Sequence, residues 1–387
     1  MKEYDRIQIQ DICSRISSGG TPKSTVEKYY GGNIPWLNTK EVNFNRIHST
    51  ERTITEEGLQ NSSAKWIDEN AVIVAMYGAT AGKSAISKIR LTTNQACCNL
   101  NIDPDKADYR FVYYALYNDY SRLASLANGG AQQNLNAMQI KEFEIPYPSI
   151  EEQTAIANFL SALDDKIEVN RQINDNLEQQ ASNLFQDWLN NCENSIMLRE
   201  LTDNVLDYTP NTHEYVYLLN SSDVTEGQFT VLPLTPNINL KGQFKKRFKK
   251  GDILYSEIRP RNRHYAYCYF DADKYIASTR LIVLRAKPEM LTSGILLYQY
   301  LMLNNVFEEF TLKTESRSGT FPQGNYEDLS SIKVPYGASQ EKIAKALESI
   351  YKQLWINLEE NKRLEALRDS LLPKLMSGEL KINEIDC

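Results

Sequence analysis

The sequence has no long apolar run, few histidines and no paired cysteine motif. No stretch approaches the roughly 18 consecutive apolar residues of a membrane span, and the chain opens with charged residues rather than an apolar segment. None of the six cysteines lies in a CxxC pair, and His48, His213 and His264 are far apart in the sequence. We therefore expect a cytoplasmic protein with reduced thiols, no metal site and no contact with a membrane.

Catalytic and cofactor-binding motifs are also missing. No loop typical of methyl transfer and no Ser-His-Asp or Cys-His set stands out. Residues 77–84 resemble a P-loop, but three residues separate Gly78 from Gly82 where that motif needs four. Two interpretations stay open: a glycine-flanked turn that brings backbone N–H groups and Lys83 near a phosphate, or a plain hairpin turn. We expect no cofactor and no catalysis by this chain alone.

The net charge of −7 is concentrated in one segment. Residues 151–192 hold 8 acidic and 2 basic side chains, whereas residues 1–150 hold 16 of each and residues 193–337 hold 17 of each. The two neutral regions leave room for local basic faces. The acidic segment is a poor DNA contact and suits a protein partner better.

A helical pattern occurs twice in the chain. Ser149 and Glu152 form a Ser-x-x-Glu capping box, which opens a helix. Behind it, apolar or small residues recur at steps of four and three, which is typical of a coiled-coil seam. The first seam comprises Ile156, Leu160, Leu163, Ile167, Asn170, Asn174, Leu177, Ala181, Leu184 and Trp188. Adding 187 gives the second: Ile343, Leu347, Ile350, Leu354, Asn357, Asn361, Leu364, Arg368, Leu371 and Leu375.

Paired asparagines sit near the middle of both seams. Asn170 and Asn174 recur as Asn357 and Asn361, and a buried amide at a seam position fixes the register of a helix pair. One compact domain separates the two helices, so the second helix starts near the far end of the first and returns. We expect an antiparallel pair; the alternative is two ordinary long helices in separate cores.

The regions before each helix also echo one another. The echo is strong at their edges and weak between them, which indicates a duplicated domain-plus-helix unit with internal pseudo-two-fold symmetry. The matched segments are residues 37–42 with 219–224, 70–74 with 251–255, and 143–146 with 332–335. The Gly78–Gly82 turn has no clear counterpart in the second region. The pattern predicts mixed α/β domains, of the α/β or α+β class.

The second region carries a basic stretch from residue 241 to residue 263, with nine basic against two acidic side chains. Lysines there are expected to contact phosphates. Arg259, Arg261 and Arg263 alternate along the chain, so an extended strand would place them on one face, where arginine can read guanine. Pro260 within the run limits such a strand to an edge or bulge. The alternative is a solvated basic surface.

Three motifs carry a family resemblance. They are Gly-Thr-Pro at 20–22 with Ile-Pro-Trp at 34–36, Ile-Pro-Tyr-Pro-Ser-Ile-Glu-Glu-Gln at 145–153, and Leu-Leu-Pro-Lys-Leu-Met-Ser-Gly-Glu-Leu at 371–380. With these motifs and the duplication, the chain resembles the specificity (S) subunits of type I restriction-modification enzymes over essentially its whole length. The resemblance implies two target-recognition domains on an antiparallel helix pair, each reading one half of a bipartite double-stranded DNA site. It also implies partners: two adenine-N6 modification (methyltransferase) subunits and ATP-dependent restriction subunits.

These observations give one set of boundaries and candidates. We predict a first domain over 1–148, a spacer helix over 149–192, a second domain over 193–337, a second spacer helix over 338–378 and a tail over 379–387. The competing hypothesis is a non-catalytic protein scaffold with two binding domains on a coiled-coil rod. The DNA-contact candidates are Thr21, Lys23, Asn38, Tyr77, Lys83, Gln132, Gln133, Asn134, Lys245, Lys246, Arg247, Lys249, Arg259, Arg261 and Arg263; the register candidates are Asn170, Asn174, Asn357 and Asn361.

Overall fold

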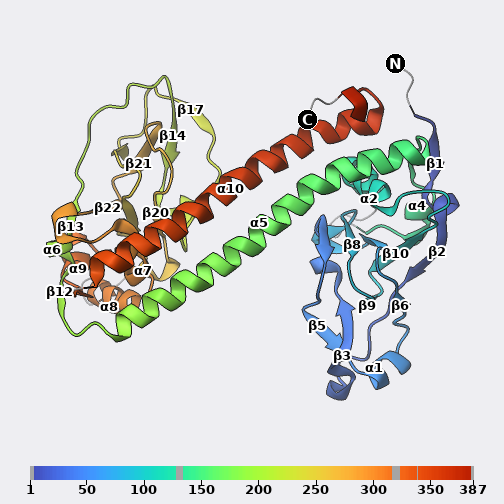
Figure 1. Cartoon of the computed structure of the whole chain (residues 1–387), viewed down its shortest axis with the longest axis horizontal. Coiled ribbons are helices and arrows are strands. Elements are labelled where there is room, and N and C mark those ends of the chain that lie inside the picture. The colour runs from blue at the N-terminus through green and yellow to red at the C-terminus, as the bar shows by residue number, and fades with distance from the viewer. Residues whose placement is uncertain (1–3, 128–133, 316–322, 338, 385–387) are drawn as a thin grey trace. The chain divides into compact units, whose positions relative to one another are not determined.

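The computed structural model describes residues 4–127, 134–315, 323–337 and 339–384, and the chain divides into two compact units (Figure 1). Unit 1 comprises residues 1–169 and 360–387, and unit 2 comprises residues 170–359. The two long helices, α5 (Ile150–Asn190) and α10 (Gln340–Ser377), are each divided between the units, with about half of each helix in unit 1 and the other half in unit 2. Each unit therefore consists of one α/β domain and a segment of both helices.

The α/β domain of unit 1 is built on two main sheets. One has the strand order β2-β10-β7-β8-β4 and the other the order β5-β3-β9-β6, while β1 pairs with β11 beside the start of α5. The strands are β1 (Arg6–Gln8), β2 (Cys13–Ser18), β3 (Tyr30–Leu37), β4 (Asn45–Ile47), β5 (Arg52–Ile54), β6 (Trp66–Ile67), β7 (Val72–Ala75), β8 (Ser84–Ser87), β9 (Leu91–Thr93), β10 (Cys97–Ile102) and β11 (Glu144–Pro146).

Helix α2 (Tyr109–Asn118) joins the first sheet to the long helices. Asp108 caps it by accepting a hydrogen bond from the Arg110 backbone, and six of its ten residues are buried. One core cluster contains Phe111 of α2, Val74 of β7, Leu160 of α5 and Leu375 of α10. The domain is thus attached to both helices through a shared apolar core. The remaining short helices of unit 1 are α1 (Glu56–Gln60), α3 (Tyr120–Ala124) and α4 (Ala137–Lys141).

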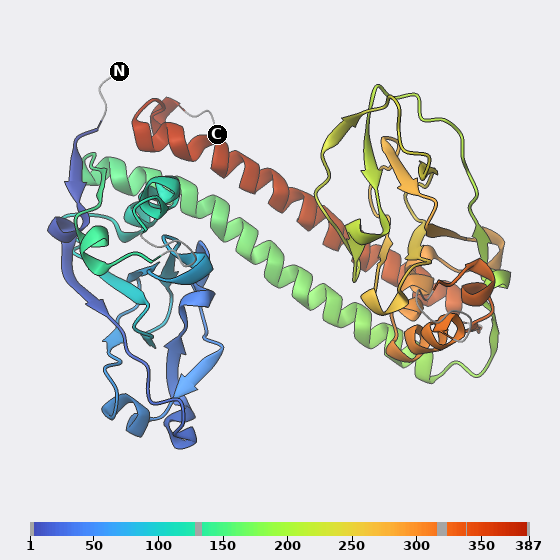
Figure 2. The same cartoon turned by 180° about the vertical axis from the view of Figure 1, so that it is seen from behind.

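Unit 2, seen from behind in Figure 2, repeats this plan. Its sheets have the orders β13-β22-β19-β20, β17-β14-β21-β18, β12-β23 and β15-β16. The strands are β12 (Ser195–Met197), β13 (Thr202–Asn204), β14 (Tyr215–Leu219), β15 (Val224–Thr225), β16 (Gln228–Phe229), β17 (Leu234–Pro236), β18 (Phe244–Lys246), β19 (Ile253–Ser256), β20 (Tyr265–Tyr267), β21 (Tyr275–Ser278), β22 (Leu281–Ala286) and β23 (Lys333–Pro335). The helices are α6 (Leu198–Leu201), α7 (Gly294–Leu301), α8 (Asn304–Glu315) and α9 (Tyr326–Ser330).

The repeat extends to strand direction. Antiparallel neighbours β2-β10-β7-β8 correspond to β13-β22-β19-β20. In the other sheet the central pair is parallel in both units, β3 with β9 and β14 with β21, and antiparallel strands flank it. The predicted fold class, a duplicated mixed α/β domain with long helices, is confirmed.

The long helices run antiparallel within each unit. In unit 1, Asp164 and Ile167 of α5 meet Arg368 and Asn361 of α10 respectively, so one sequence rises as the other falls. In unit 2, Asn174 hydrogen-bonds to Asn357. The alternative of two helices in separate cores is therefore wrong. Among the described residues, no helix is long and apolar enough to cross a membrane.

The predicted seam drifts near the end of α5. Leu184 was expected in the seam but is 42% exposed, whereas Phe185 is buried with Ala181 and Trp188. A straight α-helix turns every 3.6 residues, so a pattern of fours and threes moves off the contact line after several turns.

Candidate nucleic-acid interface

The Gly78–Gly82 turn connects the antiparallel strands β7 and β8. Both glycines have positive φ, 79° and 85°, which a residue with a side chain rarely adopts. The Gly82 N–H donates to the Ala75 carbonyl at 2.8 Å, and the turn leads into a strand rather than a helix. It is therefore a hairpin turn and not a P-loop, which requires a helix after the glycines.

This turn brings two of the predicted residues together. Tyr77 forms an isolated β-bridge with Asn134, and the adjoining Leu135 N–H donates to the Met76 carbonyl at 2.8 Å. The Tyr77 side chain is 44% exposed, and Asn134 is exposed as well. The neighbouring candidates at 132 and 133 lie outside the described residues.

Lys83, at the far side of the turn, is held by its surroundings. Its Nζ donates to Asn43 Oδ1 at 2.6 Å and lies 5.8 Å from the centre of the Phe44 ring. An amine already engaged in this way can still attract a phosphate, but it has to exchange a partner to bind one directly.

The Gly-Thr-Pro motif packs a loop against the sheets. A Cβ on Gly20 would lie 2.4 Å from the Ala64 nitrogen, and the Gly20 carbonyl accepts a hydrogen bond from Trp36 Nε1 at 2.9 Å. Thr21 donates to Gln95, while Lys23 is exposed. The motif thus fixes the loop, and Thr21 and Lys23 are its surface-facing candidates.

Asn38 has a structural role that recurs in unit 2. The Asn38 backbone N–H donates to the Glu41 carboxylate at 2.8 Å across a 3₁₀ turn, and the Asn220 backbone N–H donates to the Asp223 carboxylate at 2.6 Å in the same way. The same local sequence therefore produces the same cap in both domains. The Asn38 amide oxygen is engaged by this cap, accepting from the Lys40 backbone at 3.2 Å.

The second domain has a counterpart of the first turn, contrary to the expectation from sequence. Strands β19 and β20 are joined by residues 257–264, and Ile258 forms a β-bridge with Gln323 as Tyr77 does with Asn134. The Gly324 N–H donates to the Glu257 carbonyl at 2.8 Å, matching the bond from Leu135 to Met76. Sequence analysis missed Gln323 and Ile258. Extending the match of residues 70–74 with 251–255 leads from Tyr77 to Ile258, and extending the match of 143–146 with 332–335 leads from Asn134 to Gln323, so these flanking matches could have located them.

The predicted strand of alternating arginines is wrong. Pro260–Asn262 form a 3₁₀ turn flanked by Arg259 and Arg263, both in the left-handed region with φ of 47° and 53°. The fixed φ of proline suits the first position of a helical turn, and proline has no backbone N–H to donate to a strand ladder. The three arginines therefore do not share one strand face.

Each arginine of this turn has its own environment. Arg261 makes a two-pronged ion pair with Glu315 of α8, at 2.7 and 3.0 Å, yet its side chain remains 70% exposed. Arg263 donates to Asn304 at 2.7 Å and lies over the Phe307 ring at 4.7 Å. Arg259 is exposed. Arg259 and Arg261 are the accessible candidates, whereas Arg263 packs the turn onto α8.

The lysine run divides by strand alternation. Lys246 is 3% exposed and donates to the Leu281 carbonyl at 2.6 Å, which contradicts the prediction that it binds a phosphate. Burial lowers the pKa of Lys246. Lys245, on the opposite face of β18, is exposed beside Tyr208, and Lys249 is exposed after the strand. Arg247 is half-buried and donates to the Asp273 carbonyl at 3.0 Å.

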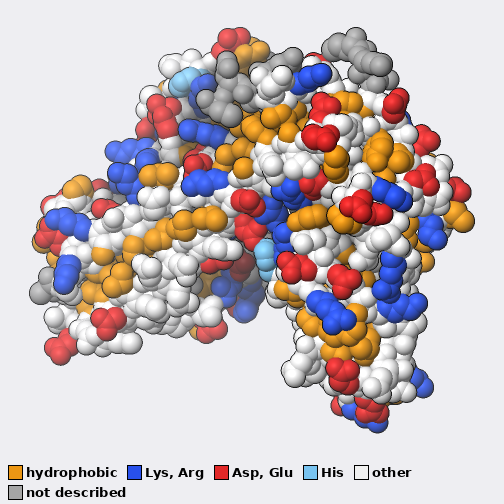
Figure 3. Space-filling model, turned by 45° about the vertical axis from the view of Figure 1, so that its right-hand side comes forward, with side chains coloured by type: hydrophobic (Ala, Val, Ile, Leu, Met, Phe, Trp, Pro, Cys, Tyr) orange, Lys and Arg blue, Asp and Glu red, His pale blue; other side chains and the backbone are white. Residues whose placement is uncertain are grey.

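The exposed basic residues form no continuous basic face on the side drawn in Figure 3, where lysine and arginine are interspersed with acidic and apolar side chains.

The four register asparagines are all buried in the helix pair. In unit 2, Asn357 Nδ2 donates to Asn174 Oδ1 at 2.8 Å, and Asn174 Nδ2 donates to the Leu354 carbonyl at 3.3 Å. In unit 1, Asn361 Nδ2 donates to the Ile167 carbonyl at 3.4 Å. Amides on one helix thus bind polar groups on the other.

Comparison with known proteins gives a consistent result. The family model described as "Type I restriction modification DNA specificity domain" matches residues 1–179 and 220–367. The chain is 25% identical to the type I restriction enzyme MjaIX specificity subunit of Methanocaldococcus jannaschii, over 99% of this chain and 95% of that protein. It is 26% identical to a putative type I specificity subunit of Mycoplasma genitalium, over 82% of this chain and 84% of that protein. The crystal structure of a type I restriction-modification S subunit from M. genitalium shares the fold, with a TM-score of 0.65, 21% identity and 96% of both chains covered.

Proposed function

The chain belongs to the type I restriction modification DNA specificity family, and on this premise we propose that each of its α/β domains reads one half of a bipartite duplex DNA site. The first recognition domain spans residues 1–148 and the second spans 193–337. The spacer segments 149–192 and 338–378, which contain α5 and α10, would set the spacing between the half-sites, and residues 379–387 are assigned to a tail. The observation that carries the proposal is the duplication of three sheets in order and direction, because two copies of one recognition scaffold suit a two-part target.

The matched turns supply the base-reading surface of each domain. In the first domain the turn after β7 presents Tyr77, and Asn134 forms a β-bridge with it. An amide side chain such as that of Asn134 can bind adenine through two hydrogen bonds. In the second domain the turn after β19 presents Arg259 and Arg261, whose guanidinium groups fit the O6 and N7 atoms of guanine. The two half-sites would therefore be read by different chemistry on equivalent loops.

Exposed lysines position the protein without reading sequence. Lys23 in the first domain, and Lys245 and Lys249 in the second, are exposed and suited to phosphate contacts. Thr21 and Lys83 lie on the same domain as Lys23 and are the remaining candidates for phosphate contacts there.

The related proteins are named as specificity subunits of restriction enzymes, and we infer that this chain acts with catalytic partners. It would recruit two adenine-N6 modification subunits and, for restriction, ATP-dependent restriction subunits. The acidic excess of residues 151–192 supports the docking of a protein rather than DNA on α5.

The test begins with the complex of this chain and its modification subunits in cells. Mapping methylated adenines should return one bipartite sequence, and binding of the purified complex to that duplex should weaken steeply with salt. Arg261→Ala should then cost about 1–3 kcal/mol at particular bases of one half-site. Lys342→Ala, which removes an exposed charge from α10, serves as the matched control and should leave base discrimination unchanged.

A protein scaffold without DNA recognition is the competing outcome. In that case no bipartite methylation pattern appears, and the complex binds duplexes of different sequence equally at low and at high salt concentration. If Arg261→Ala lowers the affinity for every duplex sequence equally, Arg261 contacts a phosphate and reads no base.

A further inference from the structure

Two positions on α5 and the same two positions on α10 join the helices to the α/β domains. Asp164 and Glu168 lie one turn apart on α5, and adding 187 leads to Tyr351 and Trp355 on α10. In each unit these residues contact the domain of that unit. The helix register is repeated, but the chemistry of the contact is not.

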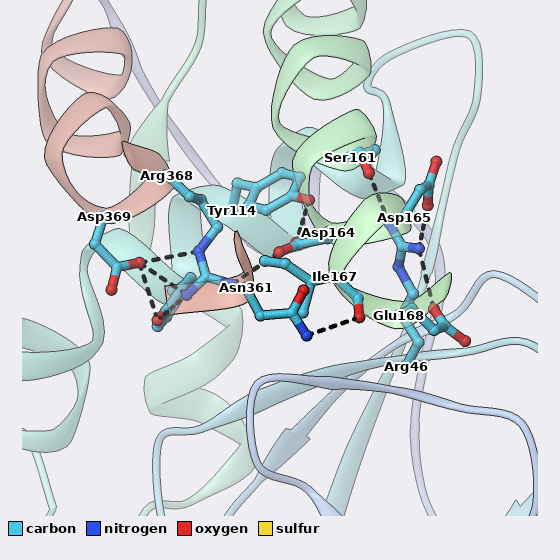
Figure 4. A network of polar contacts seen from close by, with 11 residues as sticks. Arg46, Tyr114, Ser161, Asp164, Asp165, Ile167, Glu168, Asn361, Arg368 and Asp369 are labelled. Atoms are coloured by element: carbon cyan, nitrogen blue, oxygen red, sulfur yellow. Dashed lines mark hydrogen bonds and ion pairs between the residues drawn. The ribbon is translucent and has the colours of Figure 1, made fainter. Parts of the chain in front are cut away.

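In unit 1, Asp164 is the centre of a partly buried polar network, drawn in Figure 4. Its carboxylate accepts hydrogen bonds from Tyr114 of α2 at 2.6 Å and from Arg368 of α10 at 2.7 Å. The Arg368 guanidinium also donates to Tyr117 of α2 at 3.1 Å. Burial and the Asp164 carboxylate raise the pKa of Tyr114, so its phenol stays protonated and remains the donor. One carboxylate thereby connects a domain helix to both long helices.

One turn farther along α5, ionic contacts hold the sheet edge. The Arg46 guanidinium, from edge strand β4, pairs with Asp165 and with Glu168 at 3.3 Å, and it donates to the Ser161 carbonyl at 3.4 Å. His48 Nε2 lies 2.6 Å from the other Glu168 oxygen. The Arg46 side chain is only 15% exposed, so these pairs are better shielded from solvent than ordinary surface pairs.

Unit 2 uses aromatic rings at the equivalent positions. The Trp355 ring is stacked against both Tyr267 and Tyr269, with centroid distances of 5.1 Å and interplanar angles of 9° and 12°. Tyr267 belongs to β20, and Tyr269 follows it. One turn earlier on α10, Tyr351 accepts a hydrogen bond from Gln299 of α7. Here ring stacking replaces the ion pairs of unit 1.

We propose that Glu168 with Asp164, and Trp355 with Tyr351, are positioning residues that fix the direction in which each recognition domain presents its reading turn to DNA. This inference rests on the proposed function, since it assigns one half-site to each domain. The first domain is held by an ionic joint and the second by an aromatic joint. Salt screens the exposed members of the ionic joint, Asp165 (62% exposed) and His48 (54% exposed), whereas the stacking of the aromatic rings does not depend on charge. The two half-sites should therefore respond differently to ionic strength.

The experiment uses the complete complex and three duplexes: the mapped site, and the same site with one base pair changed in either half. The ratio of affinities for intact and changed sites gives the discrimination at each half. Glu168→Gln should lower discrimination at one half-site roughly tenfold, the loss that corresponds to one charged hydrogen bond. Trp355→Leu should lower it at the other half-site. Glu289→Gln, which removes an exposed carboxylate outside both joints, should change neither.

A second arm uses the unmodified complex. Raising the salt concentration should reduce the discrimination ratio at the half-site that Glu168→Gln affects more than at the other. Circular dichroism of each variant checks folding, and Glu168→Asp, which keeps the charge but shortens the side chain, replaces Glu168→Gln if that variant does not fold.

Three results separate the possible failures. If Glu168→Gln and Trp355→Leu affect the same half-site, or both halves equally, the separate joints are refuted. If neither variant changes discrimination while the unmodified complex discriminates both halves, the residues are merely structural. If the unmodified complex discriminates neither half, the proposed function itself fails.

Discussion

Replacing Asn357 tests whether a buried amide pair specifies the pairing of the helices. Asn174 and Asn357 are 6% and 4% exposed, and the hydrogen bond between them is 2.8 Å long. Asn357→Leu removes the donor to Asn174 Oδ1 and leaves that oxygen buried without this bond. Such a loss costs about 1–3 kcal/mol of folding free energy.

The double variant gives the opposite expectation. With Asn174→Leu and Asn357→Leu together, neither buried seam amide remains, and two leucines fill the seam. The Gln353 amide, which donates to Asn357 Oδ1, is exposed and can bind water instead. Replacing both partners of a buried hydrogen bond by apolar groups is nearly neutral or stabilising. The two substitutions should therefore be coupled by roughly 0.5–3 kcal/mol, the range found for residues in contact.

Urea unfolding followed by circular dichroism at 222 nm measures these differences, because the long helices dominate that signal. The single variants should lower the transition midpoint at an unchanged slope, and the double variant should recover it. The reasoning is refuted if the double variant loses as much stability as the two single variants added together. It is also refuted if Asn357→Leu alone changes nothing.

Two further predictions concern DNA contact and spacing. Lys245→Ala should reduce the salt dependence of DNA binding by about one phosphate contact. Lys246→Met should leave that salt dependence unchanged but lower the free energy of unfolding, because it removes the hydrogen bond to the Leu281 carbonyl. Salt titrations and urea unfolding of both variants check this, and an equal salt dependence in the two variants would contradict it. Inserting one heptad after Asn170 alone should destabilise the helix pair. A matched second insertion near Asn357 should instead lengthen the spacer between the half-sites, which mapping of methylated adenines measures. An unchanged spacer in the doubly lengthened protein would show that other contacts set the spacing.

The duplication could be read from the sequence because its signals are local. A capping box, an apolar period and a repeated Leu-Asn segment each depend on neighbouring residues only, and the offset of 187 relates the two helix seams. The same local rule explains why the backbone N–H groups of Asn38 and Asn220 both donate to the carboxylate three residues on. Fold class and helix direction followed from these signals and from the length of the intervening domain.

The basic stretch shows what could not be predicted from neighbouring residues alone. Composition treats Lys245 and Lys246 alike, but β18 turns one toward solvent and the other toward the Leu281 carbonyl. Alternation predicts that neighbours on a strand differ, yet it does not say which of the two is buried. That choice depends on which face of the sheet meets the core, and strands remote in the sequence decide it.

The sequence alone determined that this chain contains two copies of one α/β unit on paired helices with buried asparagines. Only the tertiary structure decided how each unit is fastened. Asp164 and Arg368 are 204 positions apart, and their contact depends on where α2, α5 and α10 meet in unit 1. The stacking of Trp355 on two tyrosines depends likewise on the path of β20. Charge and aromatic character are visible in a sequence, but the partner of a side chain is set by the packing of segments that are far apart along the chain.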